Sequence, residues 1–131
     1  MLLDTSGLLC YLDASEQRHP RAIELYDSAR VRVTHNYVIA EFVALAQARG
    51  YPRQLALEFA DVLASTSEIE TVWVNASLHQ EALALVRAQL DKSYSLCDAV
   101  SFVVMNRRNL TDALSTDHHF TQAGFQALLI A

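Results

Sequence analysis

The sequence predicts an α/β fold, a three-layer α/β/α sandwich whose middle layer is a parallel five-stranded sheet. Two observations indicate this class. Five short segments rich in apolar or β-branched residues are separated throughout by segments with helical spacing. In addition, the 131 residues, 52% of them hydrophobic, suffice for one continuous core, and only three glycines and two prolines interrupt them. We therefore expect a single domain over residues 1–131.

The chain is expected to begin with a strand and two helices. The apolar run Met1–Leu3 meets Asp4-Thr5-Ser6, residue types that cap helices, so a strand should enter a helix that reaches Leu12. Pro20 suits the first position of a second helix. A strand is expected next at Val31–Thr34.

The middle of the chain adds three helices and one strand. Asn36 starts a helix that ends near Gly50, and Pro52 opens another. The β-branched segment Ile69–Val74 predicts a strand, and Asn75 caps the helix that follows it. This order continues the alternation of strands and helices.

The last third repeats the alternation. Ser95 and Asp98 have the spacing of a capping box, which opens a helix that runs to Arg108. Strands are expected at Ala113–Thr116 and Gln126–Ile130, on either side of a short helix at Asp117–Gln122. Because helical segments separate all the strands, a parallel sheet is favoured.

The net charge of −5 argues against a protein that coats nucleic acid by bulk electrostatics, because neutralising phosphates normally requires a basic face. A catalytic pocket needs only a local basic rim, for which the candidates are Arg49, Arg53, Lys92, Arg107 and Arg108. Cys10 and Cys97 stand apart among apolar neighbours and are interpreted as reduced core residues. No apolar run is long enough to span a bilayer, so we expect no membrane association and a cytoplasmic protein.

Four acids occupy positions of interest on this layout. Asp4 and Asp117 each follow a strand at the edge of the sheet where open parallel sheets bind ligands. Asp98 stands in the first turn of its helix. Glu41 lies in the middle of a helix, and the residues three and four positions away on the same helix face are apolar. We therefore expect Glu41 to be a buried carboxylate that needs a partner.

Convergence of the four acids would require a cation. Two carboxylates at about 4 Å repel by roughly 4 kcal/mol at an effective dielectric near 20. Oxygen ligands suit Mg²⁺ or Mn²⁺ better than zinc, and Mg²⁺ commonly bridges carboxylates to a phosphate of the substrate. Taken singly, Asp4 and Asp117 could be helix caps and Asp98 a capping-box residue. The prediction of a metal site depends on the four together.

These residues lie in motifs that resemble the PIN domain, and within it the small VapC-type toxins of prokaryotic toxin–antitoxin pairs. The motifs are Leu3-Asp4-Thr5-Ser6, Val38-Ile39-Ala40-Glu41-Phe42, Ser95-Leu96-Cys97-Asp98-Ala99-Val100-Ser101-Phe102 and Leu114-Ser115-Thr116-Asp117-His118-His119-Phe120. Their order and spacing span the whole chain. The resemblance implies a PIN-like fold and a metal-dependent endoribonuclease, with RNA as the substrate.

The resemblance also implies roles and partners. Asp4, Glu41, Asp98 and Asp117 would hold one or two Mg²⁺ or Mn²⁺ ions that activate water for attack on phosphorus. We rank Asp4 and Asp98 as the first direct ligands and Asp117 next, with Glu41 acting through water or as a base. A homodimer is implied, together with an antitoxin that fills the groove and presents an Arg to the acids.

Three hydroxyl residues, Thr5, Ser6 and Thr116, stand beside the acids and could hold the ligands or a phosphate, although capping explains each of them as well. His118 and His119 depart from the commonest family pattern and are expected to be exposed first-turn residues. Two alternative functions stay open: a catalytically idle PIN-like interaction module, and an RNA-processing PIN nuclease outside any toxin–antitoxin pair.

Overall fold

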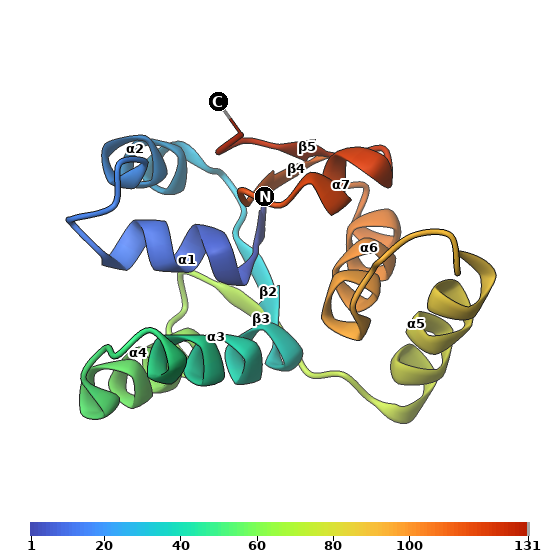
Figure 1. Cartoon of the computed structure of the whole chain (residues 1–131), viewed down its shortest axis with the longest axis horizontal. Helices are drawn as coiled ribbons and strands as arrows, with labels where there is room; N and C mark the ends of the chain where they lie inside the picture. The colour runs from blue at the N-terminus through green and yellow to red at the C-terminus, as the bar shows by residue number, and fades with distance from the viewer. Residues whose placement is uncertain (131) are drawn as a thin grey trace.

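The computed structural model describes residues 1–130 and contains the expected parallel sheet (Figure 1). Its strands lie in the order β3-β2-β1-β4-β5, and every neighbouring pair is parallel. The strands are β1 (Leu2–Leu3), β2 (Val33–His35), β3 (Glu70–Val72), β4 (Asp112–Leu114) and β5 (Gln126–Ala127). The predicted α/β class and the number of strands are confirmed.

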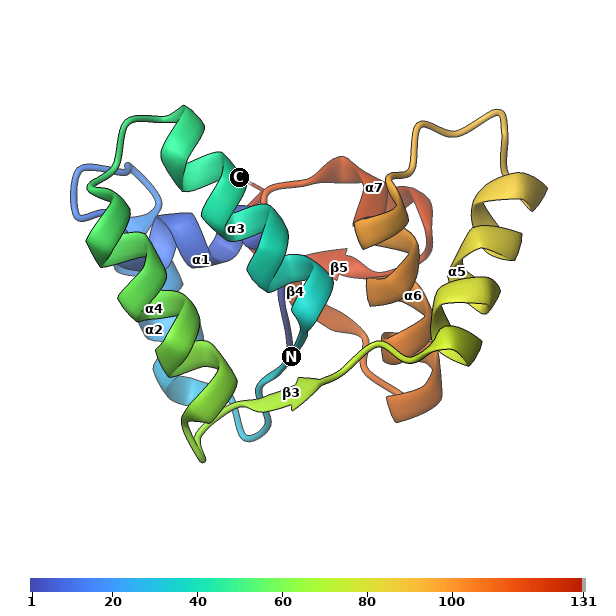
Figure 2. The same cartoon turned by 90° about the horizontal axis from the view of Figure 1, so that it is seen from below.

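Helices cover both faces of the sheet, as the two views show (Figures 1 and 2). One layer holds α1 (Thr5–Leu12), α2 (His19–Ser28), α3 (Asn36–Ala48) and α4 (Arg53–Ser65). The other holds α5 (Ala76–Ala88), α6 (Leu96–Arg108) and α7 (His118–Gln122). Within residues 1–130, none of these helices combines the length and the apolarity needed to cross a membrane.

Each helical layer has its own core against the sheet. Phe42 and Leu63 are fully buried in the core formed with α1 to α4, and Phe102, Met105 and Phe120 are fully buried in the core formed with α5 to α7. Cys10 and Cys97 are free and buried, as the sequence predicted. The sheet is therefore enclosed on both faces, and only its edges can present a site.

The strands are shorter than the sequence predicted. The expected strand Ile69–Val74 is paired only over Glu70–Val72, and Gln126–Ile130 only over Gln126–Ala127. Both are edge strands with one neighbour, and the last one ends where Ile130 N–H donates to Ala127 O in a turn. Apolar composition indicates that a segment is buried, but the length of a strand depends on how far the neighbouring strand extends. The sequence therefore predicted strands that are too long.

The path of the chain through the sheet creates a switch point between β1 and β4. From β1 the chain proceeds outward to β2 and then to β3, and it returns to the opposite side of β1 to form β4 and β5. Asp4 directly follows β1, and Asp117 follows β4 after two intervening residues. Crevices at such switch points are where open parallel sheets bind ligands, so the topology brings two of the acids to the expected place.

A close approach of α1 to β4 fixes the geometry of this switch point. A Cβ atom at Gly7 would lie 1.9 Å from the carbonyl oxygen of Leu114. Because this obstacle is backbone, no side chain can be accommodated without moving α1 away from the strand. Glycine at position 7 thus allows the first turn of α1, with Asp4 ahead of it, to lie against the end of β4.

Substitution Gly7→Ala is expected to destabilise the protein by about 3 kcal/mol or more, because overpacking against a fixed backbone forces the helix away. Gly50→Ala is the matched control. Gly50 has φ 78° and open space around it, so alanine there meets only the strain of a left-handed conformation, about 1 kcal/mol. Urea unfolding of both variants measures the difference. Equal losses would show that the α1–β4 contact is not tight.

Candidate active site

Asp4 lies at the N-cap position of α1, yet its side chain makes no capping hydrogen bond. Its Oδ2 instead accepts from Ser115 Oγ at 2.8 Å and from Ser6 Oγ at 3.1 Å. Ser115 Oγ also accepts from the backbone N–H of Asp117 at 2.9 Å. The alternative that Asp4 is only a helix cap is therefore wrong, because its carboxylate is directed across to β4.

Burial of Asp4 has a large electrostatic effect. The residue is only 4% exposed, and desolvation raises its pKa to about 7. The Ser115 hydrogen bond lowers the pKa, whereas the negative charges of Asp98 and Glu41 raise it further. Without a cation, Asp4 therefore carries a proton for much of the time near neutral pH.

Asp98 combines a structural contact with one to the site. The predicted capping box is confirmed: Ser95 Oγ accepts from Asp98 N–H, and Asp98 Oδ2 accepts from Ser95 N–H, each at 3.0 Å. The same Oδ2 lies 2.9 Å from His119 Nδ1. The capping box thus fixes the orientation of a carboxylate that also faces α7.

Asp117 does cap α7, since its Oδ1 accepts from His119 N–H at 2.9 Å. The imidazole Nδ1 of His119 lies 3.4 Å from this oxygen as well. Asp98, Asp117 and His119 each offer a ligand atom within 4.8 Å of the other two. This is a group that could hold a metal ion, formed by α6 and α7 at the end of β4.

The expectation that Glu41 is buried is wrong. The buried residues of α3 are Val38, Phe42 and Ala46, and Glu41 lies on the exposed flank of this stripe. The prediction was wrong because the buried stripe of α3 is narrow, so apolar neighbours do not by themselves place Glu41 inside it. Its charge still acts on the site, since it raises the pKa of Asp4.

Cys97 lies among the same acids. Burial raises the pKa of its thiol, and the charges of Glu41, Asp4 and Asp98 raise it further. A single buried thiol thus senses three of the four carboxylates, although they come from three different elements. These three acids therefore lie around one region at the carboxyl edge of the sheet, and Asp117 adjoins it through its proximity to Asp98.

The hydroxyl residues beside the acids differ in what they do. Ser6 Oγ donates to Asp4 and accepts from Thr116 N–H at 3.0 Å. Thr116 contacts the site through this backbone group. Within residues 1–130, Thr5 Oγ1 is the one buried side-chain polar atom without a hydrogen-bond partner. Since such an atom is costly to leave unsatisfied, it is a position for a water or a ligand beside Asp4.

Two residues of the site were missed from the sequence. Ser115 has no signal there, because one serine after a strand does not reveal what it contacts. His119 was expected to be exposed, but its side chain is 23% exposed and contacts two acids, while His118 is exposed as predicted. A His two residues after Asp117, in the first turn of a capped helix, was the only available signal.

The expected basic rim is partly wrong. Arg107 and Arg108 lie at the C-terminal end of α6, whereas Asp98 lies at its beginning, about 14 Å away along the helix axis. They pair with Glu81 and with Glu70 at the start of β3. Lys92 lines a hollow together with Tyr94, whose ring packs edge-on against His119.

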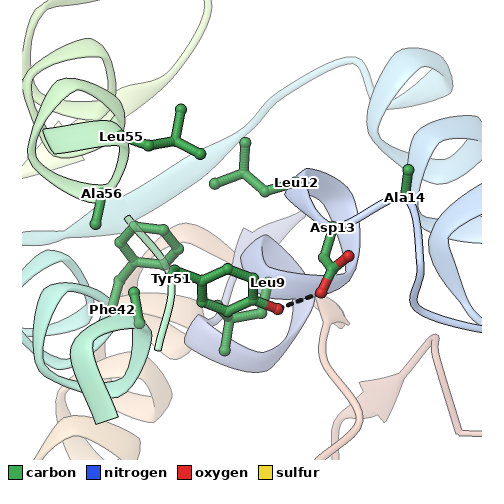
Figure 3. Close-up of a pocket in the computed structure, with 9 residues that line it drawn as sticks. Leu9, Leu12, Asp13, Ala14, Phe42, Tyr51, Leu55 and Ala56 are labelled. Carbon is green, nitrogen blue, oxygen red and sulfur yellow. Dashed lines mark hydrogen bonds between the residues drawn. The ribbon is translucent and has the colours of Figure 1, made fainter. Parts of the chain in front are cut away.

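A separate apolar pocket of about 240 Å³ lies between α1, α3 and α4 (Figure 3). Leu9, Phe42 and Leu55 contribute to its wall, and the Tyr51 hydroxyl donates to the Asp13 carboxylate at its edge. None of the four acids lines it. This pocket is a different surface from the acidic site.

The residues present fit a divalent cation. The hydrogen bonds described above involve only one oxygen of each aspartate, namely Oδ2 of Asp4, Oδ2 of Asp98 and Oδ1 of Asp117, and each carboxylate has about four lone-pair sites in all, so every aspartate keeps the capacity to bind a ligand. Hard oxygen donors and one imidazole are ligands suited to divalent metals. The raised pKa of Asp4 indicates a shortage of positive charge that a cation would supply.

The chain is similar to known proteins over nearly its whole length. A sequence model described as "PIN domain" matches residues 1–126. The 23S rRNA-specific endonuclease VapC20 of Mycobacterium tuberculosis is 30% identical over 126 residues, 95% of each chain. Ribonuclease VapC26 of the same organism is 31% identical over 124 residues, which cover 92% of this chain and 90% of VapC26.

The chain is also similar to a solved structure. The crystal structure of M. tuberculosis VapC20, described as a Sarcin-Ricin loop cleaving toxin, has a TM-score of 0.87 and 29% sequence identity to this chain, with 96% of each chain covered. The similarity therefore extends to the arrangement of the sheet and its helices.

The buried Asp4 should make the metal-free protein less stable as pH rises. The ordinary pKa of an aspartate is 3.8, whereas that of Asp4 in the folded protein is about 7, so between these values the folded state keeps a proton that the unfolded state releases. The free energy of unfolding therefore falls from about pH 4 to about pH 7, by at most about 4 kcal/mol. Asp4→Asn should remove this contribution.

Urea unfolding in the presence of EDTA, at about pH 5 and about pH 8, measures the effect. Asp61→Asn, at an exposed position on α4, is the control and should keep the wild-type pH dependence. If Asp4→Asn loses as much stability between the two pH values as the wild type, Asp4 is not the group responsible.

Proposed function

Because this chain belongs to the PIN-domain family, we propose that it is a metal-dependent endoribonuclease, the toxin of a toxin–antitoxin pair. The observation that carries the proposal is the meeting of Asp4, Asp98 and Asp117 at the switch point between β1 and β4, with Glu41 facing the same region. An idle interaction module would not need to keep a buried acid whose pKa is strongly raised.

We assign Mg²⁺ or Mn²⁺ as the cation. Asp4, Asp98 and Asp117 would be its direct ligands, and Glu41 would act through water. Magnesium favours oxygen ligands and keeps several waters, which suits a site that offers it a few carboxylates rather than a complete protein shell. Ser6 and Ser115 hold the Asp4 carboxylate, so they act as supporting residues rather than as ligands.

In hydrolysis of a phosphodiester, a divalent cation supplies activation of a water nucleophile and stabilises the charge on the leaving oxygen. The protein's contribution is to hold the carboxylates in fixed positions. The capping box orients Asp98, and the bonds to Ser6 and Ser115 orient Asp4, so both carboxylates are fixed before the substrate arrives. Glu41 is exposed, so it can reach a water on the solvent side and accept its proton.

Two partners belong to the proposal. The substrate is RNA, and the sarcin–ricin loop of 23S ribosomal RNA is the first RNA to test because VapC20 is named for cleaving it. An antitoxin would cover the apolar pocket of Figure 3, whose wall exposes Leu12 and Leu55 to solvent. We also propose a homodimer, which light scattering of the purified protein can test.

Incubation of the purified protein with labelled RNA should give cleavage with Mg²⁺ or Mn²⁺ and none with EDTA. Asp98→Asn should lower the cleavage rate at least about a hundredfold, since loss of a charged ligand removes charge stabilisation at the reacting phosphate. Asp61→Asn, which replaces an exposed acid on α4, is the control and should cleave like the wild type.

The outcome that would contradict the proposal is cleavage that survives in both Asp98→Asn and Asp4→Asn. The alternative of an interaction module would be favoured if the folded wild-type protein binds a divalent cation but cleaves no RNA, structured or unstructured.

A further inference from the structure

His119 is placed between two acids and is held there from several sides. Its Nδ1 lies 2.9 Å from Asp98 Oδ2 and 3.4 Å from Asp117 Oδ1. Its Nε2 lies 2.9 Å from Ser93 Oγ. The ring of Tyr94 packs edge-on against the imidazole, with the two centroids 5.5 Å apart. The imidazole is therefore fixed with one nitrogen directed into the acidic site.

We propose that His119 Nδ1 is a direct ligand of the divalent cation, so that the site is a mixed nitrogen and oxygen centre formed by Asp98, Asp117 and His119 together with Asp4. This inference rests on the metal site of the proposed function and adds a ligand to the four acids. It also assigns a preference, because an imidazole ligand favours Mn²⁺ relative to Mg²⁺, which prefers oxygen.

The separations between the donor atoms fit this assignment. In an octahedral shell with bonds of about 2.1 Å, two neighbouring ligand atoms are about 3 Å apart. The distances from Nδ1 to the oxygens of Asp98 and Asp117, 2.9 and 3.4 Å, lie close to this value. All three ligand atoms lie within 4.8 Å of one another, so the three side chains form a group that could hold one ion.

The other ring nitrogen has the partner that a metal-bound histidine needs. Without a cation, the neutral ring that donates Nδ1–H to the Asp98 carboxylate, which can only accept, has Nε2 as an acceptor for the Ser93 hydroxyl. Coordination uses the Nδ1 lone pair, so the ring proton moves to Nε2 by exchange with solvent, and Nε2–H then donates to Ser93 Oγ. Such an outer hydrogen bond fixes the tautomer and the ring orientation of metal-binding histidines.

The competing explanation is that His119 only donates a hydrogen bond to Asp98. In that case a bound cation would have oxygen ligands alone, and the imidazole would keep its hydrogen bond to Asp98. The two explanations predict different atoms next to the ion, and therefore a spectroscopic difference that does not depend on catalysis.

Pulsed electron paramagnetic resonance of the wild-type protein with Mn²⁺ tests the proposal directly. We expect a nitrogen coupling to the ion that changes when the histidines are labelled with ¹⁵N. His119→Gln should abolish this coupling and weaken Mn²⁺ binding roughly tenfold or more, with a smaller loss for Mg²⁺. His118→Gln is the matched control, since the adjacent side chain is exposed, and it should retain the coupling.

The wild-type spectrum alone can overturn the proposal, so it stays testable even if His119→Gln does not fold. Bound Mn²⁺ without a nitrogen coupling, or a coupling that persists in folded His119→Gln, would show that His119 is not a ligand. RNA cleavage measured on the same samples separates the two proposals. A nitrogen coupling without RNA cleavage contradicts only the nuclease function. RNA cleavage by a protein whose Mn²⁺ has oxygen ligands alone contradicts only the assignment of His119 as a ligand. If Mn²⁺ does not bind, both proposals are contradicted.

Discussion

The first turn of α1 lies against the end of β4 at a distance that only glycine at position 7 permits. The geometry of the acidic site depends on this contact. It places Ser6 beside Ser115 and Thr116, and these hydrogen bonds bring the Asp4 carboxylate across from β1 to β4. A parallel sheet provides the crevice, but van der Waals contact between two backbones determines how close the acids lie.

This proximity has an electrostatic consequence for the whole domain. The Asp4 carboxylate is buried beside other negative charges, and its raised pKa measures how unfavourable the ionised form is without a cation. In the metal-free protein a proton reduces the repulsion, and a divalent cation would replace that proton. The acidic site thus lowers the free energy of unfolding relative to an equivalent neutral core, and metal binding would restore the lost stability of the protein. In the proposed function, the residues that destabilise the metal-free fold are the same residues that would bind the ion.

Local sequence signals predicted most of the fold, whereas the roles of the four acids stay a prediction. Helix caps and alternating segments gave the order of elements, and the capping box at Ser95 was confirmed. The burial of Glu41 was predicted wrongly, because burial depends on which stripe of α3 meets its neighbours. Ser115 and His119 could not be found, because their importance lies in contacts between β4 and α1 and between α7 and α6. Such contacts have no signature within either segment.

The four acids differ in how they are held, and this difference supports a division of work. Helix caps fix Asp98 and Asp117, and two serines fix Asp4, so these carboxylates keep their positions before any ligand binds. Glu41 is exposed on the flank of α3 and is the least constrained of the four acids. A fixed set of ligands keeps an ion in one place, whereas an exposed and adaptable carboxylate can meet water and substrate as they enter. In the proposed nuclease, the fixed aspartates would therefore hold the ion, and Glu41 on α3 would meet water and substrate.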